Sequence, residues 1–166
     1  GVAKEQLASA VSGYGEKVML AYGGGSVKKN GIYDEVKNIL ADAGKEVFDF
    51  SGIMSNPTYA KVQEGAKLAK ENKIDFILAV GGGSVIDCCK IVCAQAVTDE
   101  DLWELEMVQH KAPSAAPIPL GAVVTASGTG AEMNGGAVIT NEETKIKGGM
   151  FAAAPRFAIL DPAYTM

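Results

Sequence analysis

The chain has 166 residues, of which 48% are hydrophobic and 21% charged, with a formal net charge of -5. These values are typical of a single folded, globular domain and argue against a disordered chain. The acidic balance argues against a nucleic-acid partner, which needs clustered cations, and no apolar stretch approaches the length of a membrane span.

Apolar runs and turn residues predict helices and strands that alternate along the chain. In chain order we expect a helix over 4–12, a strand over 17–22, a helix over 32–44, a strand over 46–50, a helix over 57–72, a strand over 75–80, a helix over 84–96, a short polar helix over 99–107, a strand over 118–124, a hairpin over 136–140 and 145–150, and a strand over 157–160. The central strands are apolar throughout. This pattern predicts a Rossmann-like α/β fold, with a parallel sheet covered by helices on both faces.

Two helix starts carry specific signals. Asn56 is a candidate N-cap with Pro57 at the first helical position. Ser84 followed by Asp87 is typical of a capping box, and Lys90 lies one turn further on, where it can pair with Asp87.

The cysteines and the histidine point to no metal site. Cys88, Cys89 and Cys93 fall within one predicted helix, and their spacing matches no common zinc pattern. We interpret them as reduced, partly buried thiols of a cytoplasmic protein. His110, the single histidine, stands beside Lys111 in a polar stretch, so we expect a solvated side chain.

The tetrapeptide Gly-Gly-Gly-Ser follows a predicted strand twice, at residues 23–26 and 81–84. Ligands of parallel sheets bind at the carboxyl ends of the strands, and glycines let a ligand approach the main chain. Consecutive N–H groups and the positive end of a following helix attract an anion. The alternative is that these glycines form only a turn. The spacing matches neither a Walker loop nor the G-x-G-x-x-G fingerprint.

Other features near these turns suggest a phosphorylated ligand. Lys28 and Lys29 follow the first turn, and Lys29 stands at the position that Asp87 takes after the second turn. Two cations at this position favour the 2′-phosphate of NADP over NAD. A third turn of small and hydroxyl residues, 125–132, suits a phosphate or a nicotinamide carboxamide. Lys147 is a candidate cationic partner of the same ligand. The alternatives are surface lysines and an ordinary loop.

Four stretches together resemble the iron-dependent, group III alcohol dehydrogenases. They are YGGGSVKKNGIYD (22–34), AVGGGSVIDCCK (79–90), TASGTGAEM (125–133) and FAILDPAYT (157–165). The second matches the GGGSxxDxxK pattern of that family throughout, and the nearest branch resembles the NADPH-dependent aldehyde reductases and butanol dehydrogenases. The resemblance implies a dehydroquinate synthase-like N-terminal domain that serves hydride transfer between NADP(H), or NAD(H), and a small primary alcohol or aldehyde.

The resemblance also implies a cofactor site but no catalytic residue within this chain. Gly82, Gly83 and Ser84 are expected to hold the pyrophosphate with Asp87 supporting the turn, and Gly24, Gly25 and Ser26 to surround the adenosine ribose with Asn56 nearby. Thr125, Ser127 and Thr129 are expected to border the pyrophosphate and the nicotinamide ribose, Lys147 to reach the cofactor, and Leu160 to touch the adenine.

The family holds a divalent metal, iron or zinc, through an Asp and three His of a helical C-terminal domain. That domain would begin where this chain stops, at Met166, and His110 cannot replace the ligand set. We therefore interpret residues 1–166 as one dinucleotide-binding domain, a fragment of a two-domain, homodimeric enzyme that is inactive without the rest. In the complete enzyme the metal would polarise the carbonyl group.

Two other interpretations stay open. The chain can belong to a glycerol dehydrogenase or a 3-dehydroquinate synthase, which share the superfold and bind NAD at glycine turns. It can also be a nucleotide-binding module without catalysis.

Overall fold

The computed structural model describes residues 2–24, 26–29, 31–113, 115–125, 134–152 and 154–160. A five-stranded parallel sheet in the order β2-β1-β3-β4-β7 forms its centre. The strands are β1 (Lys17–Tyr22), β2 (Glu46–Phe50), β3 (Phe76–Gly81), β4 (Leu120–Val124) and β7 (Phe157–Leu160). The parallel α/β fold expected from the sequence is thereby confirmed.

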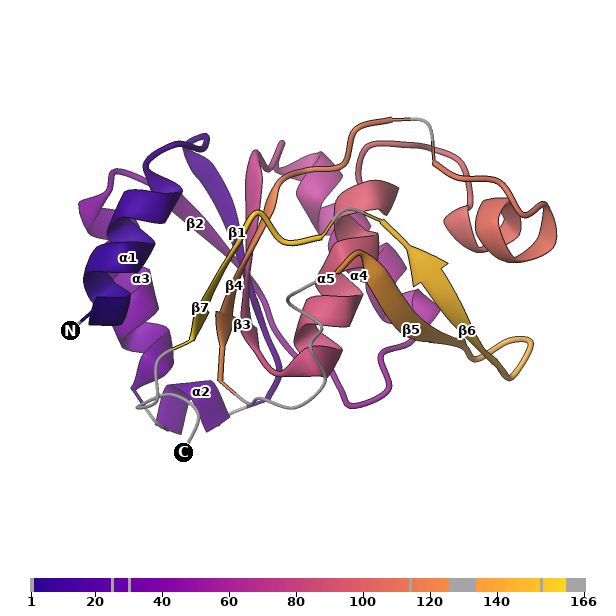
Figure 1. Cartoon of the computed structure of the whole chain (residues 1–166), viewed down its shortest axis with the longest axis horizontal. Coiled ribbons are helices and arrows are strands. Elements are labelled where there is room, and N and C mark those ends of the chain that lie inside the picture. The colour runs from indigo at the N-terminus through magenta and orange to yellow at the C-terminus, as the bar shows by residue number, and fades with distance from the viewer. Residues whose placement is uncertain are drawn as a thin grey trace.

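Helices cover both faces of this sheet (Figure 1). Helices α1 (Val2–Val11) and α3 (Ile32–Asp42) lie on one face, and α4 (Tyr59–Glu71) and α5 (Gly83–Gln95) on the other. Side chains of a strand point alternately to opposite faces. Accordingly Val18 and Leu20 of β1 join the core under α1 and α3, whereas Met19 and Ala21 join the core under α4 and α5.

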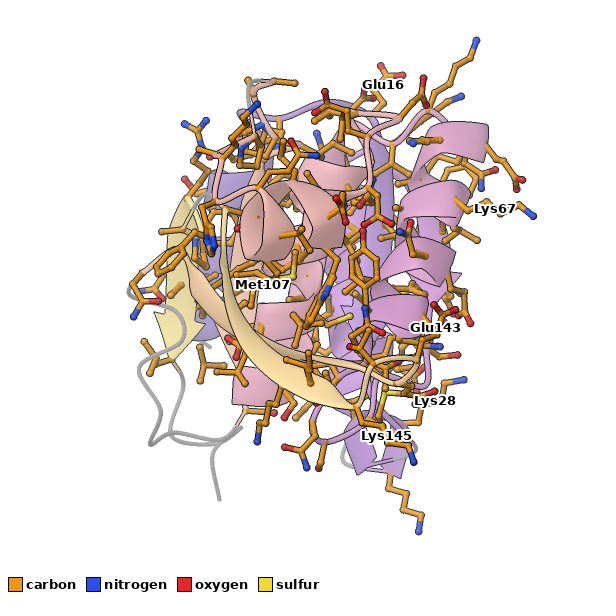
Figure 2. The ribbon with its side chains drawn as sticks, turned by 90° about the vertical axis from the view of Figure 1, so that its right-hand side faces the viewer. Glu16, Lys28, Lys67, Met107, Glu143 and Lys145 are labelled. Carbon is orange, nitrogen blue, oxygen red and sulfur yellow. The ribbon has the colours of Figure 1, made fainter. Side chains whose placement is uncertain are left out.

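An antiparallel hairpin forms a second sheet outside α5. Its strands are β5 (Gly136–Asn141) and β6 (Ile146–Phe151), paired in register from Gly136↔Phe151 to Asn141↔Ile146. Figure 2 looks onto this hairpin, with Glu143 and Lys145 at its turn and Met107 beside its strands. The hairpin predicted from the sequence is confirmed.

The polar segment before β4 differs from its prediction. The predicted helix over 99–107 is helical only from Leu102, and it continues as a π-helical segment η1 (Glu104–Val108). Segment η1 packs tightly on β6, because a Cβ at Gly148 would lie 2.5 Å from the Met107 methyl carbon. No helix in the described part of the chain is both long and apolar enough to cross a membrane.

Helix α4 begins at Tyr59, so the prediction of Asn56 as its N-cap was wrong. The cap is Thr58, whose side chain accepts a hydrogen bond from Lys61 N. Asn56 instead adopts a left-handed conformation with φ 55°. The carbonyl of Pro57 accepts the Thr140 N–H of β5 at 3.0 Å, and this contact with the hairpin holds the preceding segment outside the helix.

Helix α5 also begins earlier than predicted, and the capping box of Ser84 and Asp87 was wrong. Its N-cap is Gly82, in an extended conformation, and Ile86 N donates to Gly82 O at 3.2 Å. Strand β3 runs on to Gly81, so the helix follows the strand directly and Ser84 lies inside its first turn. Asp87 is engaged elsewhere, by the Val138 N–H of β5 at 3.2 Å.

Candidate cofactor site at the carboxyl edge of the sheet

The two glycine turns lie at the point where the sheet changes its winding direction. From β1 the chain crosses to β2 on one side and then returns to β3 on the other side of β1. In open α/β sheets, ligands bind outside the carboxyl ends of the strands at such a switch point. The turns after β1 and β3 both lie at this edge, which Lys28 marks in Figure 2, while Glu16 marks the opposite edge.

The first turn of α5 is the candidate anion-binding element at this edge. No described side chain caps the helix at Gly82, and Gly83 and Ser84 are half-buried in its first turn. The first N–H groups of a helix have no partner within it and carry partial positive charge. The absence of a side chain at Gly81 leaves room for Val85, because a Cβ at Gly81 would lie 2.7 Å from a methyl group of Val85. The φ angles of these glycines are not positive, so none of them forms a left-handed turn.

Main-chain hydrogen bonds fix the turns relative to one another. Thr125 N, at the end of β4, donates to Gly81 O at 3.0 Å. Gly52 N donates to Gly23 O at 2.9 Å, which attaches the segment after β2 to the first glycine turn. Thus the segments that carry Gly24, Ser84 and Thr125 form one continuous edge.

A cavity of about 460 Å³ lies between the start of α5 and the hairpin. Its walls are Gly83, Ser84 and Asp87 on one side and Asn134, Gly136–Val138 and Gly149–Phe151 on the other. Helix α5 therefore presents its first turn to a space large enough for one half of a dinucleotide. The other half would extend towards Gly24, which is exposed and has nothing within 4 Å of a Cβ position.

Two predicted site residues far apart in sequence meet at this edge. Lys147 Nζ, on β6, donates to Asn56 Oδ1 at 3.3 Å. Both side chains are exposed. Leu160, at the end of β7, is 52% exposed, as a side chain that contacts a ligand base would be.

A cluster around Tyr22 was missed by sequence reasoning. Helix α2 (Ser26–Lys29) places Lys28 Nζ at 4.9 Å from the Tyr33 ring centroid and 5.6 Å from that of Tyr22. Both tyrosine hydroxyls donate to Asp49 Oδ2 of β2. Burial, followed by the Asp49 carboxylate, raises the pKa of Tyr22, so this hydroxyl remains a donor. An aromatic pair and a carboxylate thus hold a lysine beside the first glycine turn.

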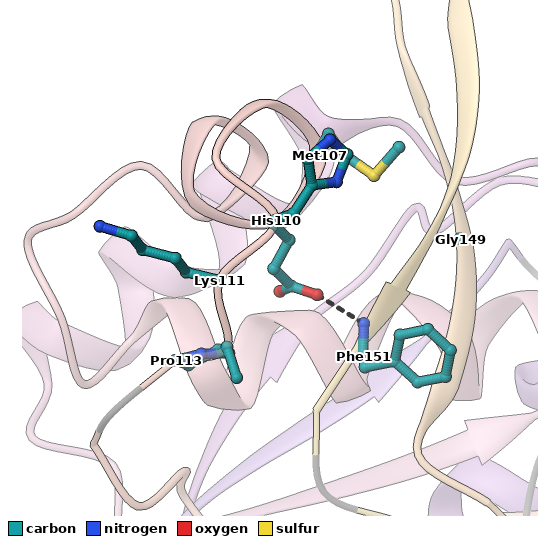
Figure 3. Close-up of a pocket in the computed structure, with 8 residues that line it drawn as sticks. Met107, His110, Lys111, Pro113, Gly149 and Phe151 are labelled. Carbon is teal, nitrogen blue, oxygen red and sulfur yellow. Dashed lines mark hydrogen bonds between the residues drawn. The ribbon is translucent and has the colours of Figure 1, made fainter.

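A second cavity, of about 380 Å³, lies on the η1 side of β6 (Figure 3). The dashed bond in Figure 3 joins the Phe151 N–H to Glu106 Oε1, at 2.7 Å. Glu106 Oε2 is buried and has no hydrogen-bond donor among the described residues. Burial raises the pKa of the Glu106 carboxyl, and the Phe151 N–H partly opposes this effect. His110, at the rim, is exposed as expected.

Some predicted site residues cannot be placed. Gly25, Ser127 and Thr129 lie outside the described residues, as does the side chain of Ser26. Sequence reasoning in turn missed Asn134 and Phe151, which line the larger cavity, because nothing in their local pattern shows that β5 and β6 pack against α5. The ion pair of Asp87 with Lys90 is confirmed at 3.7 Å, but the complete burial of Lys90 was not expected.

The three cysteines are free, as predicted, but they are completely buried and not partly buried. Burial raises the pKa of Cys88 to about 12 and that of Cys89 well above its usual range. Since the thiolate is the reactive form, these thiols are chemically inert in the folded chain. Within the described ranges no group of three or more His, Cys, Asp or Glu side chains could hold a metal ion, so these residues do not fit the metal of the resembled family.

Comparison with known proteins agrees with this geometry. The chain is 46% identical over 163 residues to "Probable NADH-dependent butanol dehydrogenase 1" of Bacillus subtilis, covering 97% of this chain and 42% of that protein. It is 43% identical over 153 residues to "NADPH-dependent aldehyde reductase YqhD" of Escherichia coli, covering 90% and 39%. The crystal structure of NADH-dependent butanol dehydrogenase A from Thermotoga maritima superposes with a TM-score of 0.90 at 40% identity, covering 99% of this chain and 42% of that one.

The chain thus spans less than half the length of these relatives. The family described as iron-containing alcohol dehydrogenase matches residues 2–162, which is nearly the whole chain. This chain belongs to the iron-containing alcohol dehydrogenase family.

Proposed function

We propose that this chain binds a nicotinamide dinucleotide at the carboxyl edge of its sheet and forms the cofactor-binding part of an NAD(P)H-dependent alcohol dehydrogenase or aldehyde reductase. The substrate class would be small primary alcohols and aldehydes. The observation that carries this proposal is the first turn of α5. It is uncapped by any described side chain, faces a cavity of about 460 Å³ and lies at the switch point of the sheet.

The residues of this chain would bind and orient the cofactor. When bound, the nicotinamide ring supplies or accepts a hydride at its C4 carbon. The N–H groups of Gly83 and Ser84 would hold the diphosphate, whose negative charge suits the positive end of α5. Lys147, placed by Asn56, would add a cation at the same edge. The hairpin would wall the nicotinamide half and limit its access to water.

NADP(H) is the preferred form in this proposal. Lys28 lies over two tyrosine rings beside Gly24, where it can meet a 2′-phosphate. Asp49, the acid on the neighbouring strand, is already bound by two tyrosine hydroxyls and is less available to a ribose hydroxyl. The curated relatives include both NADH-dependent and NADPH-dependent proteins, so the family alone does not decide between the two forms.

Parallel calorimetric titrations of the chain with NADPH and NADH test the proposal. We expect both to bind and NADPH to bind more tightly. Lys28→Ala should weaken NADPH about tenfold, the effect of one lost charge-assisted hydrogen bond, and change NADH less than twofold. Lys67→Ala is the matched control, because Lys67 is an exposed lysine of α4 with the same charge, away from this edge (Figure 2).

Two results would contradict these expectations. If neither nucleotide binds, or if the amide resonances of residues 81–84 do not shift on binding, the cofactor site is wrong. If Lys28→Ala weakens NADPH and NADH equally, the site stands but the preference for the 2′-phosphate does not.

Further parts of the proposal concern the whole protein. We place it in the cytoplasm, supported by three unpaired thiols, and expect it to form a homodimer with this chain as one domain. Light scattering of the whole protein measures its subunit number. Oxidation of NADPH in the presence of butanal separates an enzyme from a binding module without catalysis, and the family match favours the enzyme.

A further inference from the structure

Lys90, the last residue of the GGGSxxDxxK motif, does not face the cofactor cavity. Its side chain is 0% exposed. Lys90 Nζ donates to Gly136 O at 2.7 Å and to Asn134 Oδ1 at 3.3 Å, and lies 3.7 Å from Asp87 Oδ1. A buried charge is costly unless it is paired and hydrogen-bonded, so these contacts fix the ammonium group in one place.

Among the described residues, the main-chain contacts of this ion pair go to one edge of the hairpin. The carbonyl of Gly136 accepts from Lys90, and the N–H of Val138 donates to Asp87 Oδ2 at 3.2 Å. An isolated two-stranded sheet is marginally stable, and an open strand edge leaves polar groups unpaired. Side chains of α5 therefore complete the outer edge of β5 in the way that a neighbouring strand would.

The stretch of α5 from Ser84 to Lys90 joins two walls of the cavity. Ser84 and Asp87 form the wall on the helix side, and Gly136–Val138 form the facing wall. Lys90, one helical turn beyond Asp87, donates a hydrogen bond to Gly136 O of the facing wall. The separation of the two walls is thus set by the Lys90 side chain together with the contact of Asp87 with the Val138 N–H.

We propose that Lys90 is a positioning residue for the cofactor. It holds the hairpin at a fixed distance from the first turn of α5, so that the nicotinamide half of the dinucleotide fits between them, and it does not touch the nucleotide. This inference rests on the proposed function. It assigns the motif lysine to the hairpin wall and the glycines and serine of the motif to the diphosphate.

The test compares a whole cofactor with its adenosine half. Lys90→Met keeps an unbranched stem but removes the donor to Gly136 O and Asn134 Oδ1. We expect the Kd of NADPH to rise at least tenfold, while the Kd of adenosine 2′,5′-bisphosphate, which lacks the nicotinamide half, changes less than twofold. Amide exchange at Val138 should become at least tenfold faster, because β5 is released from α5.

Val92→Ala is the control for a general loss of stability. Val92 is also a buried residue of α5, but it faces α4, where its methyl group lies 3.0 Å from the Cβ position of Gly65. It should lower the melting temperature without changing the ratio of the two Kd values. If Lys90→Met does not fold, Lys90→Gln, whose side chain is uncharged and one bond shorter than that of lysine, is measured in the same way.

The outcomes separate the two proposals. If Lys90→Met or Lys90→Gln weakens both ligands equally, or neither, Lys90 is not a positioning residue for the nicotinamide half. If the parent chain binds neither ligand, the proposed function fails. In that case unchanged exchange at Val138 overturns the anchoring role of Lys90, and faster exchange supports it independently of any ligand.

Discussion

Three charged side chains, one of them completely buried and two half-buried, bind the main chain of the hairpin. Asp87 and Lys90 serve the edge of β5, and Glu106 serves the N–H of Phe151 on β6. Charged residues are mostly exposed unless they are paired. The hairpin thus gains from side chains the hydrogen bonds that a larger sheet would supply from its own strands.

Glu106 makes the stability of this arrangement depend on pH. Burial raises the pKa of its carboxyl above the ordinary value of 4.5, so the folded chain binds this proton more tightly than the unfolded chain. Between the two pKa values the folded state holds more protons, and stability falls as pH rises through that window. Glu106→Gln should therefore melt higher than the parent at pH 8, by roughly 2–4 °C for each kcal/mol relieved, and the difference should shrink towards pH 4.

Melting temperatures of the parent and of Glu106→Gln, measured between pH 4 and pH 8, test this prediction. Glu104→Gln is the control, because Glu104 is exposed on the same π-helical segment. Its melting curve should stay parallel to that of the parent. A constant difference between Glu106→Gln and the parent at every pH would show that the Glu106 carboxylate is not destabilised by burial.

At the scale of elements, the strands could be predicted, but the caps that begin α4 and α5 could not. Apolar runs such as residues 75–80 are local signals, and they identified the strands within about two residues. The starts of α4 and α5 depend on partners distant in sequence. Pro57 O accepts a hydrogen bond from Thr140 N, and Asp87 accepts one from Val138 N. These contacts with the hairpin replace the caps predicted at Asn56 and Ser84.

Gly65 shows a packing requirement that opposes local preference. It lies inside α4, where alanine is favoured by about 1 kcal/mol over glycine. A Cβ there would lie 2.6 Å from the Phe50 ring and 3.0 Å from a Val92 methyl group. Because neither group is a flexible chain end, Gly65→Ala should lower the free energy of unfolding by about 1–3 kcal/mol, as overpacking does.

Urea unfolding of Gly65→Ala beside Gly13→Ala tests this packing argument. Gly13 follows α1 and has nothing within 4 Å of its Cβ position. The Gly13 variant should stay within about 0.5 kcal/mol of the parent. A Gly65 variant more stable than the parent would mean that α4 can move away from β2 and α5 at little cost.

For the whole molecule, the candidate site depends on strand order more than on any motif. The sequence placed glycine turns after two strands, but it could not show that β1 and β3 are neighbours at a switch point. Nor could it show that Lys147 and Asn56 meet, since that contact joins residues 91 positions apart. These relations follow from the packing of the sheet, α5 and the hairpin, which no short stretch encodes.

Amide exchange across the whole chain would show whether the nucleotide joins these parts. Strands β1, β3 and β4 each have two strand neighbours, whereas β5 and β6 have one each, so the hairpin should exchange faster without ligand.

NADPH at about 100 times its Kd should slow any opening that abolishes binding by about a hundredfold, or 2.7 kcal/mol. The hairpin should show this full factor, because its opening removes one wall of the cavity. Amides of α1 that exchange by fraying should not change, because α1 packs on α3 and β7 away from the cavity. Slowing in the sheet without slowing in the hairpin would mean that the nucleotide binds this chain without contacting β5 and β6.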